Sequence, residues 1–93
     1  MDPAPVALRL VIEGRVQGVG FRDACRRAAA KAGIAGWVRN LPDGRVEAWL
    51  EGDRDAVGRV AAWCRHGPSW AGVSNVELHD VEPAGHGDFR VTV

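Results

Sequence analysis

The sequence has no excess of charge of either sign, few cysteines and no long hydrophobic run. Lys and Arg together number 12, as do Asp and Glu, so no net positive field draws the chain onto nucleic acid or an anionic membrane. Cys25 and Cys64 show no CxxC spacing, which favours buried thiols over a metal site or a disulfide framework. No segment approaches membrane-spanning length and the N-terminus lacks a signal-peptide pattern, so we expect a cytoplasmic location.

The residues that are present fit one globular domain. A chain of 93 residues, of which 46% are hydrophobic and 26% charged, is long enough for one core but not for two. We expect residues 1–5 to form an N-terminal tail and residues 6–93 to form a single domain. Lys31 is the only lysine, so nearly all basic residues are Arg, the side chain best suited to paired contacts with phosphate.

The first half of the chain predicts a strand, a helix and a hairpin. Apolar and polar residues alternate over residues 6–14, the period of a strand that buries one face. Residues 21–32 carry apolar side chains at helical spacing, and a glycine follows them as a stop. The segments 36–40 and 45–51 flank Asp43-Gly44, which suits a tight turn between antiparallel strands.

The second half predicts one more helix and two short strands. Asp53 or Asp55 can cap the helix, which Gly67-Pro68 ends, and one of its faces is apolar: Val57, Val60, Ala61 and Cys64. Val76 and Leu78 indicate a fourth strand, and a last one follows the turn-rich residues 83–87 at Phe89, Val91 and Val93. This order predicts an α+β fold, the ferredoxin-like split β-α-β sandwich (βαββαβ plus a short extra strand), with two helices on one face of an antiparallel sheet.

A glycine-rich loop lies between the first strand and the first helix. Gly14, Gly18 and Gly20 allow sharp turns and let backbone N–H groups approach a ligand. Residues 18–21 include no Ser, Thr, Asn or Asp, so the first-turn amides lack a side-chain cap and could be satisfied by an anion. Arg22 adds a permanent charge there. An ordinary turn followed by a solvated arginine is the alternative, and the loop alone leaves both open.

Strand order brings a second polar residue to this loop. A crossover helix makes strands one and two parallel, so Asn40 and the loop emerge at the same edge of the sheet. A carboxamide there could orient a water, or it could bond to backbone at the turn. Arg39 is the rival candidate, because neighbouring strand residues point to opposite faces and alternation alone does not choose between them.

Other polar and aromatic residues carry weaker signals. The three histidines, His66, His79 and His86, have no metal-ligand spacing, and the two serines, Ser69 and Ser74, lie outside any nucleophile motif. The four tryptophans, Trp37, Trp49, Trp63 and Trp70, lack an accompanying basic patch, so they indicate core and shielding roles rather than stacking on nucleic acid.

Two motifs together resemble the acylphosphatase family. They are the stretch from Gly14 to Arg22 and Gly36-Trp37-Val38-Arg39-Asn40 followed by Asp43-Gly44-Arg45-Val46-Glu47, at the family's spacing. The resemblance covers residues 6–93 and implies metal-independent hydrolysis of acyl phosphates to a carboxylate and inorganic phosphate, without a cofactor. It implies that Arg22 binds phosphate and that Asn40 positions the attacking water. The phosphate-binding loop it implies consists of Arg15, Val16, Gln17, Gly18, Val19 and Gly20.

The resemblance also defines the expected partners and the alternatives. We expect a monomer that binds a small acyl phosphate, with phosphate as product and competitive ligand, and that binds neither nucleic acid nor membrane. Asp23 departs from the family pattern by placing a negative charge beside the site, Leu41 by lacking a hydroxyl, and residues 69–75 match least well. The alternative is a regulatory module that binds phosphate or carbamoyl phosphate with little turnover.

Overall fold

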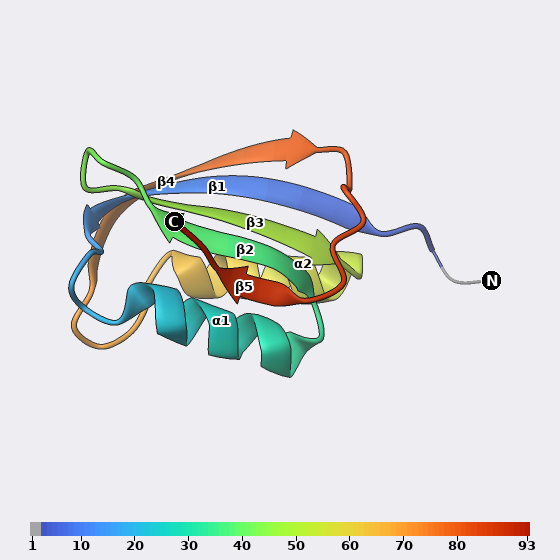
Figure 1. Cartoon of the computed structure of the whole chain (residues 1–93), viewed down its shortest axis with the longest axis horizontal. Helices are drawn as coiled ribbons and strands as arrows, with labels where there is room; N and C mark the ends of the chain where they lie inside the picture. The colour runs from blue at the N-terminus through green and yellow to red at the C-terminus, as the bar shows by residue number, and fades with distance from the viewer. Residues whose placement is uncertain (1–2) are drawn as a thin grey trace.

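The computed structural model describes residues 3–93. They form one mixed sheet with two helices on one of its faces, joined by loops (Figure 1). The strands are β1 (Val6–Arg15), β2 (Ala35–Asn40), β3 (Val46–Gly52), β4 (Gly72–Val81) and β5 (Phe89–Val91), and the helices are α1 (Phe21–Ala32) and α2 (Arg54–Cys64). The strands lie side by side in the order β4-β1-β3-β2-β5. The predicted ferredoxin-like α+β fold is confirmed.

Strand directions place the ends of β1 and β2 together. β3 runs antiparallel to both, so β1 and β2 are parallel and their C-terminal ends lie at the same edge of the sheet. β5 runs parallel to β2, which makes the sheet mixed rather than wholly antiparallel. The cause lies in the path of the chain: β4 ends beside the start of β1, and residues 82–88 then cross to the start of β2.

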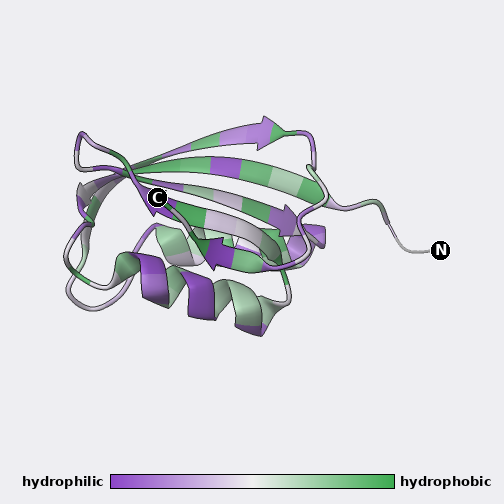
Figure 2. Cartoon of the chain, in the orientation of Figure 1, coloured by the Kyte–Doolittle hydropathy of each residue, from purple (hydrophilic) through white to green (hydrophobic). Residues whose placement is uncertain are grey.

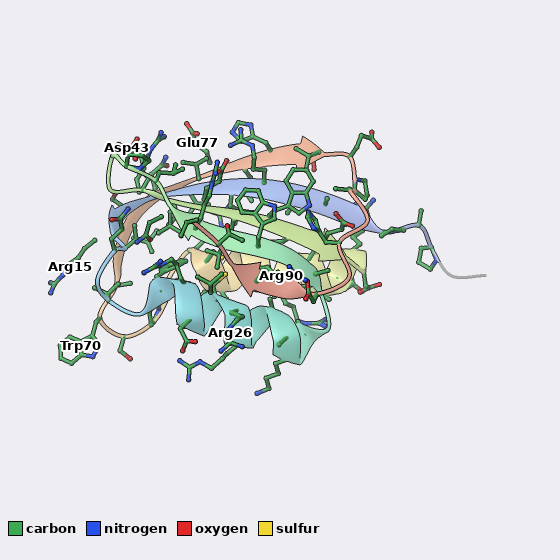
Figure 3. The ribbon with its side chains drawn as sticks, viewed as in Figure 1. Arg15, Arg26, Asp43, Trp70, Glu77 and Arg90 are labelled. Atoms are coloured by element: carbon green, nitrogen blue, oxygen red, sulfur yellow. The ribbon has the colours of Figure 1, made fainter. Side chains whose placement is uncertain are left out.

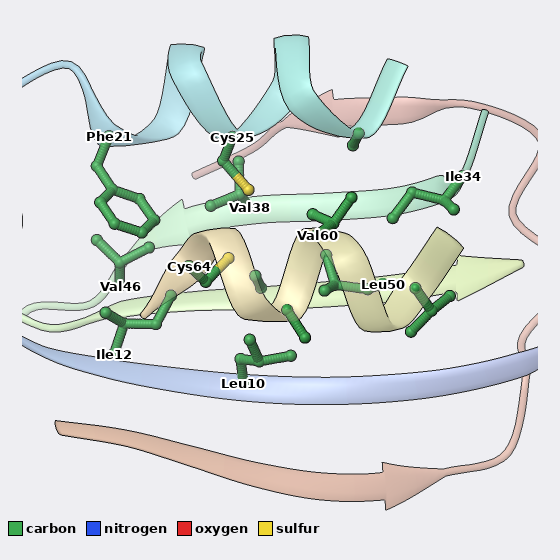
Figure 4. Packing of buried hydrophobic residues seen from close by; sticks show 14 of the residues in the cluster. Leu10, Ile12, Phe21, Cys25, Ile34, Val38, Val46, Leu50, Val60 and Cys64 are labelled. Atoms are coloured by element: carbon green, nitrogen blue, oxygen red, sulfur yellow. The ribbon is translucent and has the colours of Figure 1, made fainter. Parts of the chain in front are cut away.

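The core lies between the sheet and the helices (Figure 4). Alternate residues of β1 and β3, including Leu10, Ile12 and Leu50, are fully buried against α1 and α2. Cys25 and Cys64 are free and buried in this layer, as predicted. A hydrogen bond with Cys25, together with burial, raises the pKa of the Cys64 thiol well above its usual value, so Cys64 is a protonated, apolar core residue at neutral pH.

The helix boundaries follow local sequence closely. α1 covers the predicted residues 21–32 and ends at Gly33, whose left-handed backbone (φ 72°) lets its N–H group bond back to the helix. Asp53, one of the two predicted caps of α2, accepts a hydrogen bond from the Ala56 N–H group at 3.1 Å. The charged residues Asp23, Arg26, Arg27 and Lys31 of α1 are exposed. Figure 2 shows hydrophilic stretches along α1 in purple. Within residues 3–93 no helix is long and apolar enough to cross a membrane.

The last two strands differ from their predicted extents. β4 starts at Gly72, before the predicted Val76, because it is an edge strand whose mostly exposed residues give little alternation. β5 stops at Val91, so placing Val93 in the strand was wrong. The pairing with β2 reaches only Val38, and Val93 is fully exposed at the end of the chain.

Candidate functional site

Three glycines shape the loop between β1 and α1. A Cβ atom at Gly14 would collide with the backbone oxygen of Gly72, so only glycine permits this close approach of β1 to β4. Gly18 and Gly20 have open space around them, but their φ angles of 72° and 79° lie in the left-handed region that other residues rarely adopt. The loop therefore reverses direction just before the helix begins.

The loop leaves a row of backbone donors free. Gly20 precedes α1 without any side-chain cap, and the first N–H group that bonds back is that of Ala24, to the Gly20 oxygen at 3.1 Å. Among residues 3–93, no acceptor bonds the N–H groups of residues 17–23. These donors lie at the positive end of the helix dipole, so they form a place for an anion.

Arg22 lies in the pocket that these donors border. The pocket has a volume of about 310 Å³ and is lined by Val16, Gly18, Gly20, Phe21, Arg22, Asp23 and Val91. Arg22 is half-buried, and within the described residues its guanidinium forms no ion pair or hydrogen bond. Arg15 instead projects into solvent near Trp70, at the same end of the molecule (Figure 3). A single guanidinium therefore joins the free amides.

Gln17 connects the loop to the β2–β3 hairpin. Its side-chain amide donates to the Leu41 oxygen at 2.8 Å and to the Arg45 oxygen at 2.9 Å. Leu41 directly follows Asn40, so this side chain ties the two halves of the candidate site together. The sequence predicted Gln17 only as part of the loop backbone. Its position within the glycine motif marked it as a candidate, but nothing in the motif indicated that its side chain bonds to Leu41 and Arg45.

Asn40 lies at the end of β2 with an unsatisfied acceptor. Its side-chain oxygen Oδ1 is buried and has no hydrogen-bond partner among residues 3–93. Asn40 shares the helix-facing side of β2 with the fully buried Val38. A buried carbonyl oxygen without a donor is costly, so this atom is suited to a water or a ligand.

Arg39, the rival candidate, is occupied on the opposite face of the sheet. Its guanidinium donates to Glu47 at 2.7 Å and lies 5.3 Å from the Trp37 ring centre. Glu47 is buried and also pairs with Arg9 at 3.0 Å. Arg39 therefore neutralises a buried carboxylate there, and the structure separates it from the loop.

Asp23 lines the pocket but pairs away from Arg22. Its carboxylate accepts a hydrogen bond from Arg26 at 2.9 Å and lies 3.3 Å from the Arg27 Nε atom. The Arg26 hydrogen bond, together with the nearby Arg27 charge, holds the pKa of Asp23 below its usual value. Asp23 is thus ionised at neutral pH, and its partners follow it on α1 by three and four residues.

The remaining candidates lie outside this pocket. Asp43 pairs with Arg45 in the hairpin turn; the Arg45 backbone N–H group is the main cause of its lowered pKa. Leu41 contributes its backbone oxygen to Gln17. The histidines and serines judged weak in sequence are exposed: His66, His79, His86, Ser69 and Ser74. Trp70 is 76% exposed, so the core and shielding role expected for it was wrong. Within residues 3–93, no three His, Cys, Asp or Glu side chains are grouped to hold a metal ion.

These observations define a class of protein: a small α+β domain that holds an anion on a glycine loop at the start of a helix. The acylphosphatase family model matches residues 8–91. An acylphosphatase from Anaeromyxobacter dehalogenans is 54% identical over 87 residues, covering 92% of this chain and 94% of its own. A solved acylphosphatase structure from Coxiella burnetii has a TM-score of 0.92 and 36% identity, over 96% of this chain and 94% of its own. One from Bacillus subtilis has a TM-score of 0.91 and 34% identity, over 95% of this chain and 99% of its own.

The chain belongs to the acylphosphatase family. It is an enzyme that hydrolyses acyl phosphates, releasing a carboxylate and inorganic phosphate. The predicted family, activity and substrate class are confirmed.

Proposed function

We propose that the loop amides and Arg22 bind the phosphoryl group while Asn40 positions the attacking water. The binding groups are the backbone of Arg15, Val16, Gln17, Gly18, Val19 and Gly20, with the Arg22 guanidinium on the phosphoryl oxygens. The Asn40 Oδ1 atom accepts a hydrogen bond from the water, which turns a lone pair of the water oxygen toward phosphorus. The observation that carries this proposal is the buried, unpartnered Oδ1 atom at the same sheet edge as the unpaired amides.

The reaction needs little more than placement. The water oxygen forms a bond to phosphorus as the bond from phosphorus to the acyl oxygen breaks, and that electron pair leaves with the carboxylate. One water proton passes to a phosphoryl oxygen, so the products are a carboxylate and protonated phosphate. A carboxylate is a weak base and leaves without protonation, while amides and Arg22 stabilise charge on the phosphoryl oxygens. No side-chain base is required.

Arg22→Gln tests the phosphate-binding half of the proposal. Loss of a charged hydrogen bond is expected to weaken competitive inhibition by phosphate by about 1.5 to 3 kcal/mol, with folding unchanged because the Arg22 side chain has no partner among residues 3–93. The inhibition constant of phosphate is the measurement, and Arg59→Gln on the exposed face of α2 is the control. Equal phosphate inhibition in wild type and Arg22→Gln would remove Arg22 from the site.

Asn40→Ala tests the water-positioning half. We expect kcat to fall about 100-fold, because the water loses its orientation, while phosphate still inhibits as in wild type. Steady-state kinetics with benzoyl phosphate measures both quantities. Asn75→Ala, at an exposed site on β4, is the matched control. Turnover at the wild-type rate in Asn40→Ala would refute the proposed role.

We also propose that the enzyme acts as a monomer in the cytoplasm. The two buried free thiols suit a reducing compartment. Charged residues on the edge strand β4, such as Glu77 and Asp80, disfavour strand pairing between copies. Balanced charge supports the absence of nucleic-acid and membrane partners. Light scattering measures the mass in solution and so tests the proposed monomer. We also propose the division into a tail of residues 1–5 and a domain of residues 6–93; residues 1–2 lie outside the described part.

A further inference from the structure

The pocket at the start of α1 has two chemically different sides. Gly18, Gly20 and Arg22 offer donors and positive charge to a phosphoryl group, and Val16 and Phe21 form a buried floor with 1% exposure each. Asp23 and Val91 complete the lining, and neither side chain can donate to phosphate. The substrate's other part, its acyl group, must therefore meet these two residues.

Val91 is an apolar residue of the pocket lining that comes from β5 and not from the loop or α1. It lies on β5, where it pairs with Val38 of β2, and the chain brings it beside the loop from the far end of the sequence. Its exposed fraction is 41%, although it borders a pocket that is otherwise polar at the rim. An apolar acyl group lying on Val91 removes more of this surface from water, which favours binding, whereas a polar group loses hydration there.

Asp23 gives the same rim a negative charge. Its side chain is 61% exposed and is held by Arg26 and Arg27, which do not line the pocket. This pairing keeps the carboxylate away from Arg22, whose guanidinium stays available to the phosphoryl group. Asp23 lines the pocket and Arg26 and Arg27 do not, so an acyl group with its own carboxylate meets the Asp23 charge first.

We propose that Val91 and Asp23 form the acyl-binding side of the site and select apolar, uncharged acyl groups over acyl groups that carry a carboxylate. This inference rests on the phosphate site proposed above, because the bound phosphoryl group fixes where the acyl group starts. Val91 sets the preference for apolar over polar acyl groups. Asp23 sets the discrimination against anionic ones.

The experiment compares kcat/KM for three substrates. Acetyl phosphate has a small acyl group, benzoyl phosphate has a large apolar one, and succinyl phosphate has one that carries a carboxylate. Val91→Thr keeps the branched shape of the side chain and its preference for a strand while a hydroxyl replaces one methyl group. We expect it to lower kcat/KM for benzoyl phosphate about three- to tenfold relative to acetyl phosphate, mainly through KM. Val91→Ala is expected to act in the same direction, and Val93→Thr, at the fully exposed chain end, is the control.

Asp23→Asn tests the charge with the side-chain shape preserved. We expect kcat/KM for succinyl phosphate to rise about threefold relative to acetyl phosphate, and the gain to shrink at high ionic strength. Glu77→Gln, an exposed acid on β4, is expected to leave this ratio unchanged. Unchanged ratios in Val91→Thr, Val91→Ala and Asp23→Asn, each with a wild-type circular dichroism spectrum, would overturn the proposal.

Two failures remain distinguishable. If the acyl side is wrong but the phosphate site is right, the substrate ratios stay constant and Arg22→Gln still weakens inhibition by phosphate. If the phosphate site is wrong, Arg22→Gln leaves the inhibition constant of phosphate unchanged whatever the ratios do. Altered phosphate inhibition in Val91→Thr would also count against the proposal, since Val91 is assigned to the acyl group alone.

Discussion

The Gln17 side chain, and not only its backbone, connects the loop of the proposed phosphate site to the β2–β3 hairpin. The side-chain amide donates to two carbonyl oxygens of the hairpin, those of Leu41 and Arg45, and thereby fixes the distance between the loop and Asn40. Each of these bonds is worth about 0.5–1.5 kcal/mol net to stability, but a displacement of about 1 Å in the relative placement of phosphate and water costs far more in rate.

We expect Gln17→Met, which keeps the length of the side chain and removes both donors, to lower kcat at least tenfold and to weaken phosphate inhibition. Gln17→Glu is expected to be worse, because its carboxylate would face two carbonyl oxygens. Steady-state kinetics and urea denaturation on the same samples separate activity from stability. A variant that loses stability while its folded fraction keeps full activity would show that Gln17 only holds the hairpin.

At the scale of elements, Glu51 of β3 fastens the segment that leads to β5. Glu51 as a whole residue is 5% exposed, and its carboxylate accepts hydrogen bonds from the Trp49 indole at 2.9 Å and from the N–H groups of Ala84, Gly85 and His86 at 2.8 to 3.0 Å. Burial raises the pKa of Glu51, but these four hydrogen bonds outweigh burial and the pKa lies below its ordinary 4.5. The path from β4 to β5, and so the placement of Val91, depends on this carboxylate.

Glu51→Gln is expected to lower the free energy of unfolding by about 1 to 3 kcal/mol at pH 7. Because the folded-state pKa is depressed, the carboxylate's contribution is complete above the unfolded-state pKa near 4.5 and is lost as pH falls through the lower folded value. The difference between wild type and variant should therefore shrink below pH 4.5 in urea titrations. Glu77→Gln should stay within about 0.5 kcal/mol of wild type, and a pH-independent loss in Glu51→Gln would contradict this account.

The range of each interaction decided what the sequence could predict. α1 and the β2–β3 hairpin were predictable because periodicity, Gly33 and Asp43-Gly44 act within a few residues. The placement of Asn40 near the loop followed from strand order, a general rule of topology. The partners of Gln17 and the backbone partners of Glu51 lie more than 20 residues away, and no local pattern encodes them. β4 was underestimated for a related reason, since an exposed edge strand needs little hydrophobic alternation.

At the scale of the whole molecule, the pocket and the hydrophobic core share residues. Phe21 closes the floor of the pocket, is 1% exposed, and packs in the same cluster as Leu10, Leu50 and Val60. α1 therefore carries the loop of the proposed phosphate site at one end and packs against the core along its length. A domain of this size with a single core unfolds in an all-or-none manner, so a ligand bound at the loop stabilises every element at once.

Phosphate is therefore expected to raise the melting temperature of the wild type but not of Arg22→Gln. At a phosphate concentration tenfold above its dissociation constant the folded state gains about 1.4 kcal/mol. For a domain of this length the gain corresponds to a rise of roughly 5 to 11 °C. Calorimetry with sodium chloride at matched ionic strength as the reference removes the general salt effect, and Arg59→Gln should respond like wild type. An equal rise in Arg22→Gln would mean that phosphate binds elsewhere on the molecule, because the loop amides alone lack the charge that makes this site selective for it.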